Sequence, residues 1–306
     1  MANSDFKRIL VAIADPAAGV DNAIRRASAI AHKMDASIEL FHAMPSVVSA
    51  GIAHADAEHF TRAEAQESRR RLERTANRLR REELIVTTHV QTGYPVHESI
   101  LRQVRSTKPD LVIIEARKHN VFARLLLTQT DFELIRGCPV PLLIVKGRAA
   151  WRSPRILAAL DPFHGSDQSR DLDAQIVAAA RAIGTAFRGS VHAAHIYRPL
   201  EQSLLGVPIG PVIMEPILAQ ERAYKRAVRR QFIEAVGDYG ISRAKTHLVS
   251  GDARTEIPVL ARSISAGLVV MGATSRSGLK RIFIGSTAEH VLDSLQCDVL
   301  VVKAAK

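Results

Sequence analysis

The chain has 306 residues, 47% of them hydrophobic, and a formal net charge of +11. That length is about twice the usual domain size, so two domains with separate cores are expected. No stretch approaches the roughly 18 to 20 apolar residues that span a bilayer, and the N-terminus does not resemble a secretory signal. We therefore expect a cytoplasmic protein with no membrane partner. Cys138 and Cys297 are too few for a disulfide framework or a zinc knuckle and are interpreted as buried free thiols.

Helical segments and short apolar runs alternate along the chain. In the first half the expected helices cover 19–33, 55–81, 96–106 and about 130–136. In the second half they cover 167–187, 217–236, 255–265 and 286–295. The apolar runs between them lack strict alternation, which is typical of strands buried on both faces of a parallel sheet. The pattern predicts an α/β fold with right-handed crossovers and doubly wound sheets.

Much of the excess positive charge lies in one predicted helix, at 68–81. Its apolar and small side chains recur at helical spacing, and arginines fill the other faces. We interpret it as a solvated amphipathic helix. Nucleic acid is not an expected partner, because no aromatic residues are interleaved for base stacking and no reading motif is present.

An internal repeat defines the architecture. The segment Asp110–Lys146 matches Gly267–Lys303 without gaps. Three earlier pairs of segments also match: Arg8–Asp15 with Arg155–Asp161, Ser37–Ala43 with Ser190–Ile196, and Thr88–Gly93 with Thr246–Gly251. The sequence thus predicts two tandem five-stranded domains, 1–148 and 153–306. The junction between them, Gly147–Pro154, is short, so the two domains should pack against each other.

Glycines and hydroxyl residues follow the fourth predicted strand of the second half. The chain turns at Gly272 and enters a helix at Gly285, Ser286 and Thr287, with Arg276 nearby. A helix N-terminus with unpaired N–H groups, hydroxyls and a cation is a natural phosphate site. The alternative is a glycine turn followed by an ordinary N-cap.

This stretch resembles the signature of the universal stress protein family, in which a glycine, two residues and a second glycine precede nine residues, a glycine and a serine or threonine. Gly272, Gly285 and Ser286 match that signature, whereas Ser275 replaces its second glycine. A Cβ at this position restricts close approach of the backbone to a ligand. Nucleotide binding is therefore expected to be weakened, although the hydroxyl of Ser275 can donate a hydrogen bond instead.

The resemblance extends over essentially the whole chain and implies the adenine nucleotide alpha hydrolase-like fold. It implies that Asp161 meets the base, that the backbone of Ile196 contacts adenine and that Gly251 lies near the ribose. ATP with Mg²⁺ is then the expected cofactor of the C-terminal half. On pattern alone, an aspartate that ends a strand is more often a turn or cap residue.

The N-terminal half keeps Asp15 and Gly93 but not the loop. Glu115 stands where the second half has Gly272, Lys118 where it has Ser275, and Thr128 where it has Gly285. A carboxylate at the first of these positions repels phosphate. We expect this half to have lost nucleotide binding.

The resemblance implies a non-catalytic stress-response protein whose halves form a pseudo-dimer, with further dimerisation open. The last strands of the two halves, 141–146 and 298–303, are expected to meet and form the seam between the domains. The alternative is an interaction module or a carrier of a small apolar ligand, indicated by the proline-rich apolar stretch Leu204–Leu218. The matched histidine pairs, His42 with His195 and His89 with His247, are interpreted as satisfied by backbone groups rather than as catalytic.

Overall fold

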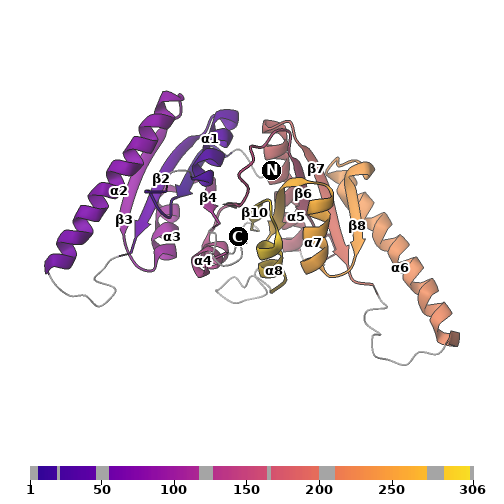
Figure 1. The fold of residues 1–306 in the computed structure, drawn as a ribbon. Coiled ribbons are helices and arrows are strands. Elements are labelled where there is room, and N and C mark those ends of the chain that lie inside the picture. Colours follow the sequence, from indigo (N-terminus) through magenta and orange to yellow (C-terminus); the bar gives the residue numbers. More distant parts are fainter. Residues whose placement is uncertain are drawn as a thin grey trace.

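The computed structural model describes residues 6–18, 21–45, 55–116, 127–163, 167–199, 211–273 and 286–303. In this part of the chain a ten-stranded sheet runs through the whole molecule, and helices cover both of its faces (Figure 1). The long helices α2 and α6 lie at opposite ends of the molecule. None of the described helices is both long and apolar enough to cross a membrane.

The N-terminal half contributes five strands and four helices to the described structure. They are β1 (Arg8–Ala12), α1 (Asn22–Met34), β2 (Ser37–Met44), α2 (Ala55–Arg81), β3 (Val86–Thr92), α3 (Val96–Thr107), β4 (Leu111–Glu115), α4 (Gln129–Gly137) and β5 (Leu142–Val145). Each helix predicted for this half is present, with ends that differ by a few residues at most.

The C-terminal half repeats this order. Its elements are β6 (Arg155–Ala159), α5 (Asp167–Ala186), β7 (Ser190–Tyr197), α6 (Pro211–Asp238), the 3-10 turn η3 (Arg243–Lys245), β8 (Thr246–Ser250), α7 (Ala253–Ser263), β9 (Ala266–Gly272), α8 (Ser286–Ser294) and β10 (Asp298–Val302). Helix α6 begins six residues earlier than predicted. The second part of the stretch Leu204–Leu218 is therefore helix rather than loop, and 204–210 lies outside the described residues.

The strands follow the order β3-β2-β1-β4-β5-β10-β9-β6-β7-β8. All neighbours are parallel except β5 and β10, which are antiparallel and join the two five-stranded sheets edge to edge. At this seam Leu143 pairs with Leu300, and Ile144 pairs with Val299. The predicted seam is thereby confirmed. Pairing removes two apolar strand edges that would otherwise be open to other chains.

Alternate residues of each strand supply two cores that continue across the seam. Leu143 and Leu300 belong to the core under α1, α2, α5 and α6. Their neighbours Ile144 and Val299 belong to the core under α3, α4, α7 and α8. Side chains of successive strand residues point to opposite faces, so one short run such as 142–145 serves both layers.

A buried ion pair ties α1 to the start of β10. Arg26 contacts the carboxylate of Asp298 at 2.6 Å, and the two side chains are 6% and 1% exposed. The other carboxylate oxygen of Asp298 accepts the backbone N–H groups of Lys146 and Gly147 at 2.9 and 2.8 Å. Burial raises the pKa of Asp298 and lowers that of Arg26 from their ordinary values. This contact joins three segments from both halves.

Two lysines at equivalent positions reach across the seam in opposite directions. Lys146, at the end of β5, donates to the carbonyl oxygens of Leu292 and Leu295 at the end of α8. Lys303, at the end of β10, donates to the carbonyl oxygen of Arg136 in α4 at 2.7 Å. A cation at a helix C-terminus satisfies unpaired carbonyls and complements the helix dipole. Each half thus supplies a cap for a helix of the other.

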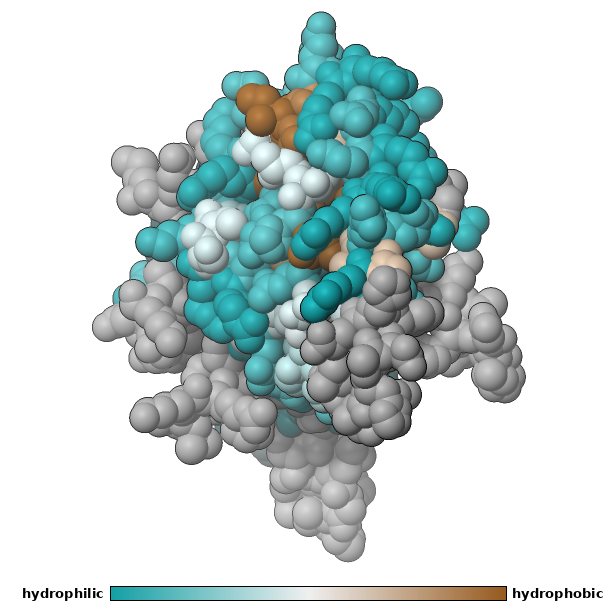
Figure 2. Space-filling model, turned by 90° about the vertical axis from the view of Figure 1, so that its left-hand side faces the viewer, coloured by the Kyte–Doolittle hydropathy of each residue, from teal (hydrophilic) through white to brown (hydrophobic). Residues whose placement is uncertain are grey.

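Helix α2 is solvated as predicted. Leu72, Ala76 and Leu79 are buried, while the neighbouring arginines are exposed or half-buried. Arg80 forms an ion pair with Glu73 at 3.1 Å. Figure 2 shows this end of the molecule as a mainly hydrophilic surface with small apolar spots.

Both cysteines are free thiols, as predicted. Cys138 is buried, and burial raises the pKa of its thiol to about 11. Cys297 is only half-buried, which corrects the expectation that both thiols would be buried.

Replacing Asp298 by Asn should destabilise the protein by about 3 to 5 kcal/mol, because Arg26 would keep a buried charge without its partner. The amide oxygen of the new side chain still accepts the N–H groups of Lys146 and Gly147, so the loss of stability reports only the unpaired charge of Arg26. The double change Arg26→Met with Asp298→Asn should recover most of the stability. Urea unfolding of the three proteins measures both effects; equal stability of wild type and Asp298→Asn would contradict the role given to the pair.

Candidate functional site

The residues predicted for the C-terminal site meet at one edge of the sheet. The neighbouring strands run in the order β9-β6-β7-β8 and are parallel, so their carboxyl ends share an edge. Gly272 ends β9, Asp161 follows β6, Ile196 is the penultimate residue of β7, and Gly251 follows β8. Ligands of doubly wound sheets bind at this edge.

The loop between β9 and α8 is not described. Ser275, Arg276 and Gly285 therefore lie outside the described residues. Helix α8 begins at Ser286 and continues through Thr287, as the sequence predicts. Of the predicted site residues, the described part of the chain thus contains Asp161, Ile196, Gly251 and Gly272 together with the first residues of α8.

Asp161 presents a half-exposed carboxylate beside a buried histidine. Its side chain is 52% exposed, and one oxygen lies 3.8 Å from Nδ1 of His195. That nitrogen lies 3.1 Å from the carbonyl oxygen of Leu160, which can only accept, so Nδ1 carries the proton. Phe163 packs edge-on against the imidazole at 4.8 Å. His42 bonds the carbonyl of Ile13 in the same way at 2.8 Å, which confirms the interpretation of this histidine pair.

The second histidine pair differs between the halves. The ring of His89 stacks on that of Phe41 with the ring centroids 5.7 Å apart. In the second half, Nε2 of His247 lies 3.0 Å from Nδ1 of His192. Burial lowers the pKa of both His192 and His247. Their partners are therefore side chains, contrary to the expected backbone groups. In the described part of the chain, no three or more metal-ligating side chains of His, Cys, Asp or Glu cluster together.

The structure corrects the pairing of Asp15 with Asp161. The N–H of Ile13 bonds Phe41 in the first half, and the N–H of Leu160 bonds Ala194 in the second, so Ile13 and Leu160 are equivalent. The counterpart of Asp161 is then Ala14, and Asp15 lies one residue further on. Its carboxylate accepts the N–H of Ala17 at 2.7 Å. The first half therefore lacks an aspartate at the base-contacting position that the resemblance assigns.

Packing explains two of the predicted site glycines. A Cβ on Gly272 would lie 2.5 Å from a methyl of Leu172 in α5, a helix of 20 residues where α1 has 13. Gly251 has a φ of +144°, and a Cβ there would lie 2.7 Å from Cγ of Glu256. Packing and backbone conformation therefore account for a glycine at both positions without any ligand.

Two carboxyl groups occupy the corresponding place in the N-terminal half. Glu115, which replaces Gly272, accepts the backbone N–H and the side-chain amide of Asn22 at 2.8 and 2.5 Å. Asp21 caps the same helix by accepting the N–H of Ile24 at 3.0 Å. Burial, together with the nearby Glu115, raises the pKa of Asp21 to about 6. The N-terminus of α1 is thus already held by carboxyl groups of this chain.

The helix after the loop is also self-capped in the first half. Thr128 accepts the N–H of Asp131 at 3.2 Å, and the carboxylate of Asp131 accepts the N–H of Thr128 at 2.7 Å. This capping box fills the N-terminus of α4. The repeat places Ala288 where α4 has Asp131, so this position of α8 carries no carboxylate, and the acidic residue of its first turn is Glu289. The Thr-x-x-Asp pattern could have revealed this from the sequence.

A cavity of about 340 Å³ lies at the carboxyl edge of the N-terminal half. Apolar side chains such as Ile13, Ile100, Ile114 and Leu134 line it, together with Glu115, Thr128 and Asp131. Sequence reasoning did not predict this cavity. Its acidic groups disfavour a phosphate, whereas its walls suit a small apolar molecule.

Asp21→Asn should stabilise the protein near neutral pH. The folded-state pKa of about 6 lies above the ordinary 3.8, so the folded state holds a proton that the unfolded state has lost between these values. Stability therefore falls as pH rises through this window, and the cost remains above it. Asn still caps α1. Unfolding at several pH values should show a gain of about 1 to 3 kcal/mol above pH 6 and little gain near pH 4; an equal gain at both would contradict the assignment.

Gly272→Ala should destabilise the chain by about 1 to 3 kcal/mol through overpacking against Leu172. In a Leu172→Ala background the same change should cost much less, because the clashing methyl is absent. A double-mutant cycle of unfolding free energies measures the difference. Additive costs would show that the glycine is needed for a reason other than this contact.

Comparisons with known proteins identify the family of the chain. The model of the universal stress protein family matches residues 5–146 and 153–303. Universal stress protein E of Escherichia coli K12 is 30% identical over 218 residues, covering 67% of this chain and 64% of that protein, slightly less than two thirds of its length. The universal stress protein E homolog of Haemophilus influenzae is 28% identical over 73% of this chain and 72% of its own.

Solved structures show the same two-domain arrangement. A functionally unknown protein from Pseudomonas aeruginosa PAO1 is 27% identical and superimposes with a TM-score of 0.72, covering 99% of this chain and 94% of its own. A universal stress protein from Archaeoglobus fulgidus shares the fold at 17% identity and a TM-score of 0.69. With both halves matched by one family model, the chain belongs to the universal stress protein family as a tandem member.

Proposed function

We propose that this chain is a non-catalytic, cytoplasmic stress-response protein that binds one adenine nucleotide, ATP with Mg²⁺, in its C-terminal half. The observation that carries the proposal is the contrast between α4 and α8. Asp131 fills the N-terminus of α4, whereas Ala288 leaves the equivalent position of α8 without an oxygen. Unpaired N–H groups at a helix N-terminus attract phosphate.

The residues of the C-terminal edge fit the other parts of a nucleotide. The half-exposed carboxylate of Asp161 can accept a hydrogen bond from the exocyclic amine of adenine. Ile196 would contact the base through its backbone, and Gly251 would lie near the ribose. Ser275, Arg276, Gly285, Ser286 and Thr287 would surround the phosphates, and Mg²⁺ would offset their charge.

The N-terminal half is unsuited to the same ligand in this proposal. Glu115 and Asp131 place carboxylates where phosphates would lie, and Ala14 replaces the base-contacting aspartate. Desolvating phosphate beside these groups is unfavourable. One nucleotide per chain is therefore the expected stoichiometry.

Calorimetry with Mg-ATP on the full chain tests the proposal. Ala288→Asp should weaken binding at least about tenfold, because the new carboxylate would take the helix N-terminus as Asp131 does. The protein should stay folded, since the new residue forms half of a capping box. Ala288→Asn is the matched neutral control and should weaken binding less.

Two further variants define the site. Asp131→Ala should leave the stoichiometry at one, because it changes only the N-terminal half. Ser275→Gly should tighten binding, because it restores the glycine of the family signature. Absence of both heat and thermal shift with millimolar Mg-ATP would overturn the nucleotide proposal.

A second candidate is the binding of a small apolar ligand without nucleotide. The apolar cavity of the N-terminal half favours it, because Ile13, Ile100, Ile114 and Leu134 line a volume suited to such a molecule. Native mass spectrometry of purified protein separates the two candidates. A co-purifying mass other than an adenine nucleotide would support the second.

A further inference from the structure

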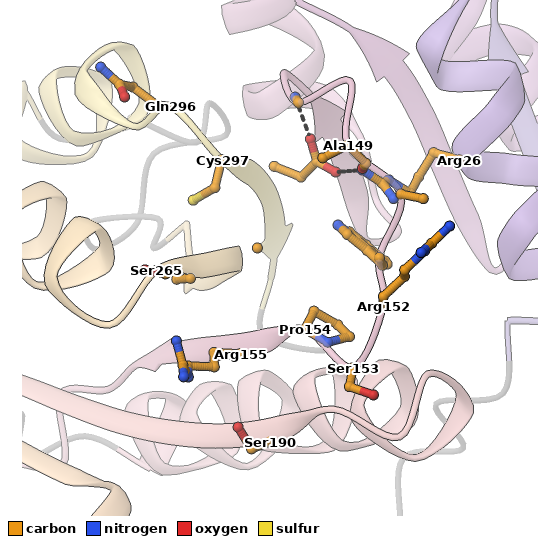
Figure 3. Close-up of a pocket in the computed structure, with 16 residues that line it drawn as sticks. Arg26, Ala149, Arg152, Ser153, Pro154, Arg155, Ser190, Ser265, Gln296 and Cys297 are labelled. Atoms are coloured by element: carbon orange, nitrogen blue, oxygen red, sulfur yellow. Dashed lines mark hydrogen bonds and ion pairs between the residues drawn. The ribbon is translucent and has the colours of Figure 1, made fainter.

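A cavity of about 540 Å³ lies where the two halves join, and we call it the junction cavity (Figure 3). Residues that begin four strands of the second half form part of its wall: Arg155 of β6, Ser190 of β7, Ala266 of β9 and Asp298 of β10. These strands are parallel, so the cavity lies at the edge opposite to Asp161 and Gly272. Its volume is typical of small-molecule sites. It is separate from the proposed nucleotide site.

The wall of the junction cavity is positively charged. It contains Arg26, Arg152 and Arg155 and one acidic residue, Asp298. The carboxylate of Asp298 already pairs with Arg26 at 2.6 Å. Arg155 donates to the uncharged carbonyl of Ile264 at 2.9 Å, and Arg152 has no ion pair among the described residues. Arg152 and Arg155 are exposed, and neither forms an ion pair with a carboxylate among the described residues.

Figure 3 shows how the labelled residues lie around this space. Arg155 lies with Ser190 and Ser265 on one side of the view, and Arg152 lies near Arg26 on the other. Cys297 belongs to the same wall, and burial raises the pKa of its thiol to about 12. The thiol is therefore neutral and adds no negative charge.

Trp151 places an unused hydrogen-bond donor in the wall. The residue is only 8% exposed, and its indole Nε1 is buried without an acceptor. The guanidinium of Arg26 lies over the ring at 4.1 Å, and Phe187 packs edge-on at 5.3 Å. Gly267, another wall residue, lies beside the indole: a Cβ there would lie 3.2 Å from Cβ of Pro154 and 3.9 Å from Nε1 of Trp151. Buried donors in proteins nearly always have partners.

We propose that the junction cavity binds a small organic oxyanion, a carboxylate or a phosphate monoester with a compact apolar body. One ligand oxygen accepts the N–H of Trp151, and Arg152 and Arg155 balance the charge. The small side chains of Ala149, Ala150 and Ala266 leave room for the apolar body. Arg26 of α1 and Asp298 of β10 hold this wall together across the two halves.

Trp151 is the only tryptophan of the chain, so the ¹⁵N-labelled protein has a single indole N–H signal in its NMR spectrum. Benzoate and phenyl phosphate are the probes for the two kinds of oxyanion, and benzyl alcohol is the neutral analogue. A saturable downfield shift of the indole signal is expected with at least one anion and not with the alcohol. No shift with either anion at millimolar concentration would overturn the proposal, as would an equal shift with inorganic phosphate alone.

Substitutions test the part played by charge. The double change Arg152→Gln with Arg155→Gln should weaken binding of the anion at least about tenfold. Arg148→Gln is the matched control, because Arg148 is an exposed arginine of the same linker that does not line the cavity. Ala288→Asp should leave the indole shift unchanged, which separates this site from the nucleotide site. Unaltered affinity in the double variant would overturn the proposal.

Discussion

The antiparallel pairing of β5 with β10 is the contact on which the rest of the molecule depends. It turns two five-stranded sheets into one and allows two cores to continue from one half to the other. Asp298 holds the start of this seam, because its carboxylate binds two N–H groups of the linker and the guanidinium of Arg26. The repeat has Pro141 at the matching position, so this contact exists once rather than twice. It also fixes where Trp151 and the linker lie.

Nearly the same backbone carries different chemistry at the two carboxyl edges. In the first half Glu115, Asp21 and Asp131 hold the N-termini of α1 and α4. In the second half Leu172 of the longer α5 packs on Gly272, and Ala288 stands where α4 has Asp131. The difference arises from a few side chains at helix ends rather than from the fold. A duplicated scaffold can thus keep its stability while its two edges diverge.

The repeat and the hydrophobic patterns were enough to predict the α/β fold and the helices, whereas the seam was implied by the family resemblance. The sequence comparison placed Asp15 opposite Asp161 because both segments begin with arginine and end with aspartate. The first segment is one residue longer, and the comparison did not show where the extra residue lies. The hydrogen bonds of Ile13 and Leu160 and the strand register reveal the shift. The contact of Arg26 with Asp298 could not be predicted, since no local pattern links a helix of one half to a strand of the other. The pairing of His192 with His247 likewise depends on strand register.

The exchanged lysines, Lys146 and Lys303, affect how the two repeats can evolve. Each completes a helix end that belongs to the opposite repeat, at Leu295 for one and Arg136 for the other. A mutation of either lysine therefore removes hydrogen bonds from a helix end of the other repeat, whose own sequence is unchanged. A repeat taken from a related protein would therefore need a lysine at the same position to complete the helix end of the other repeat. Because each lysine serves the other repeat, a substitution at either lysine affects the stability of both halves.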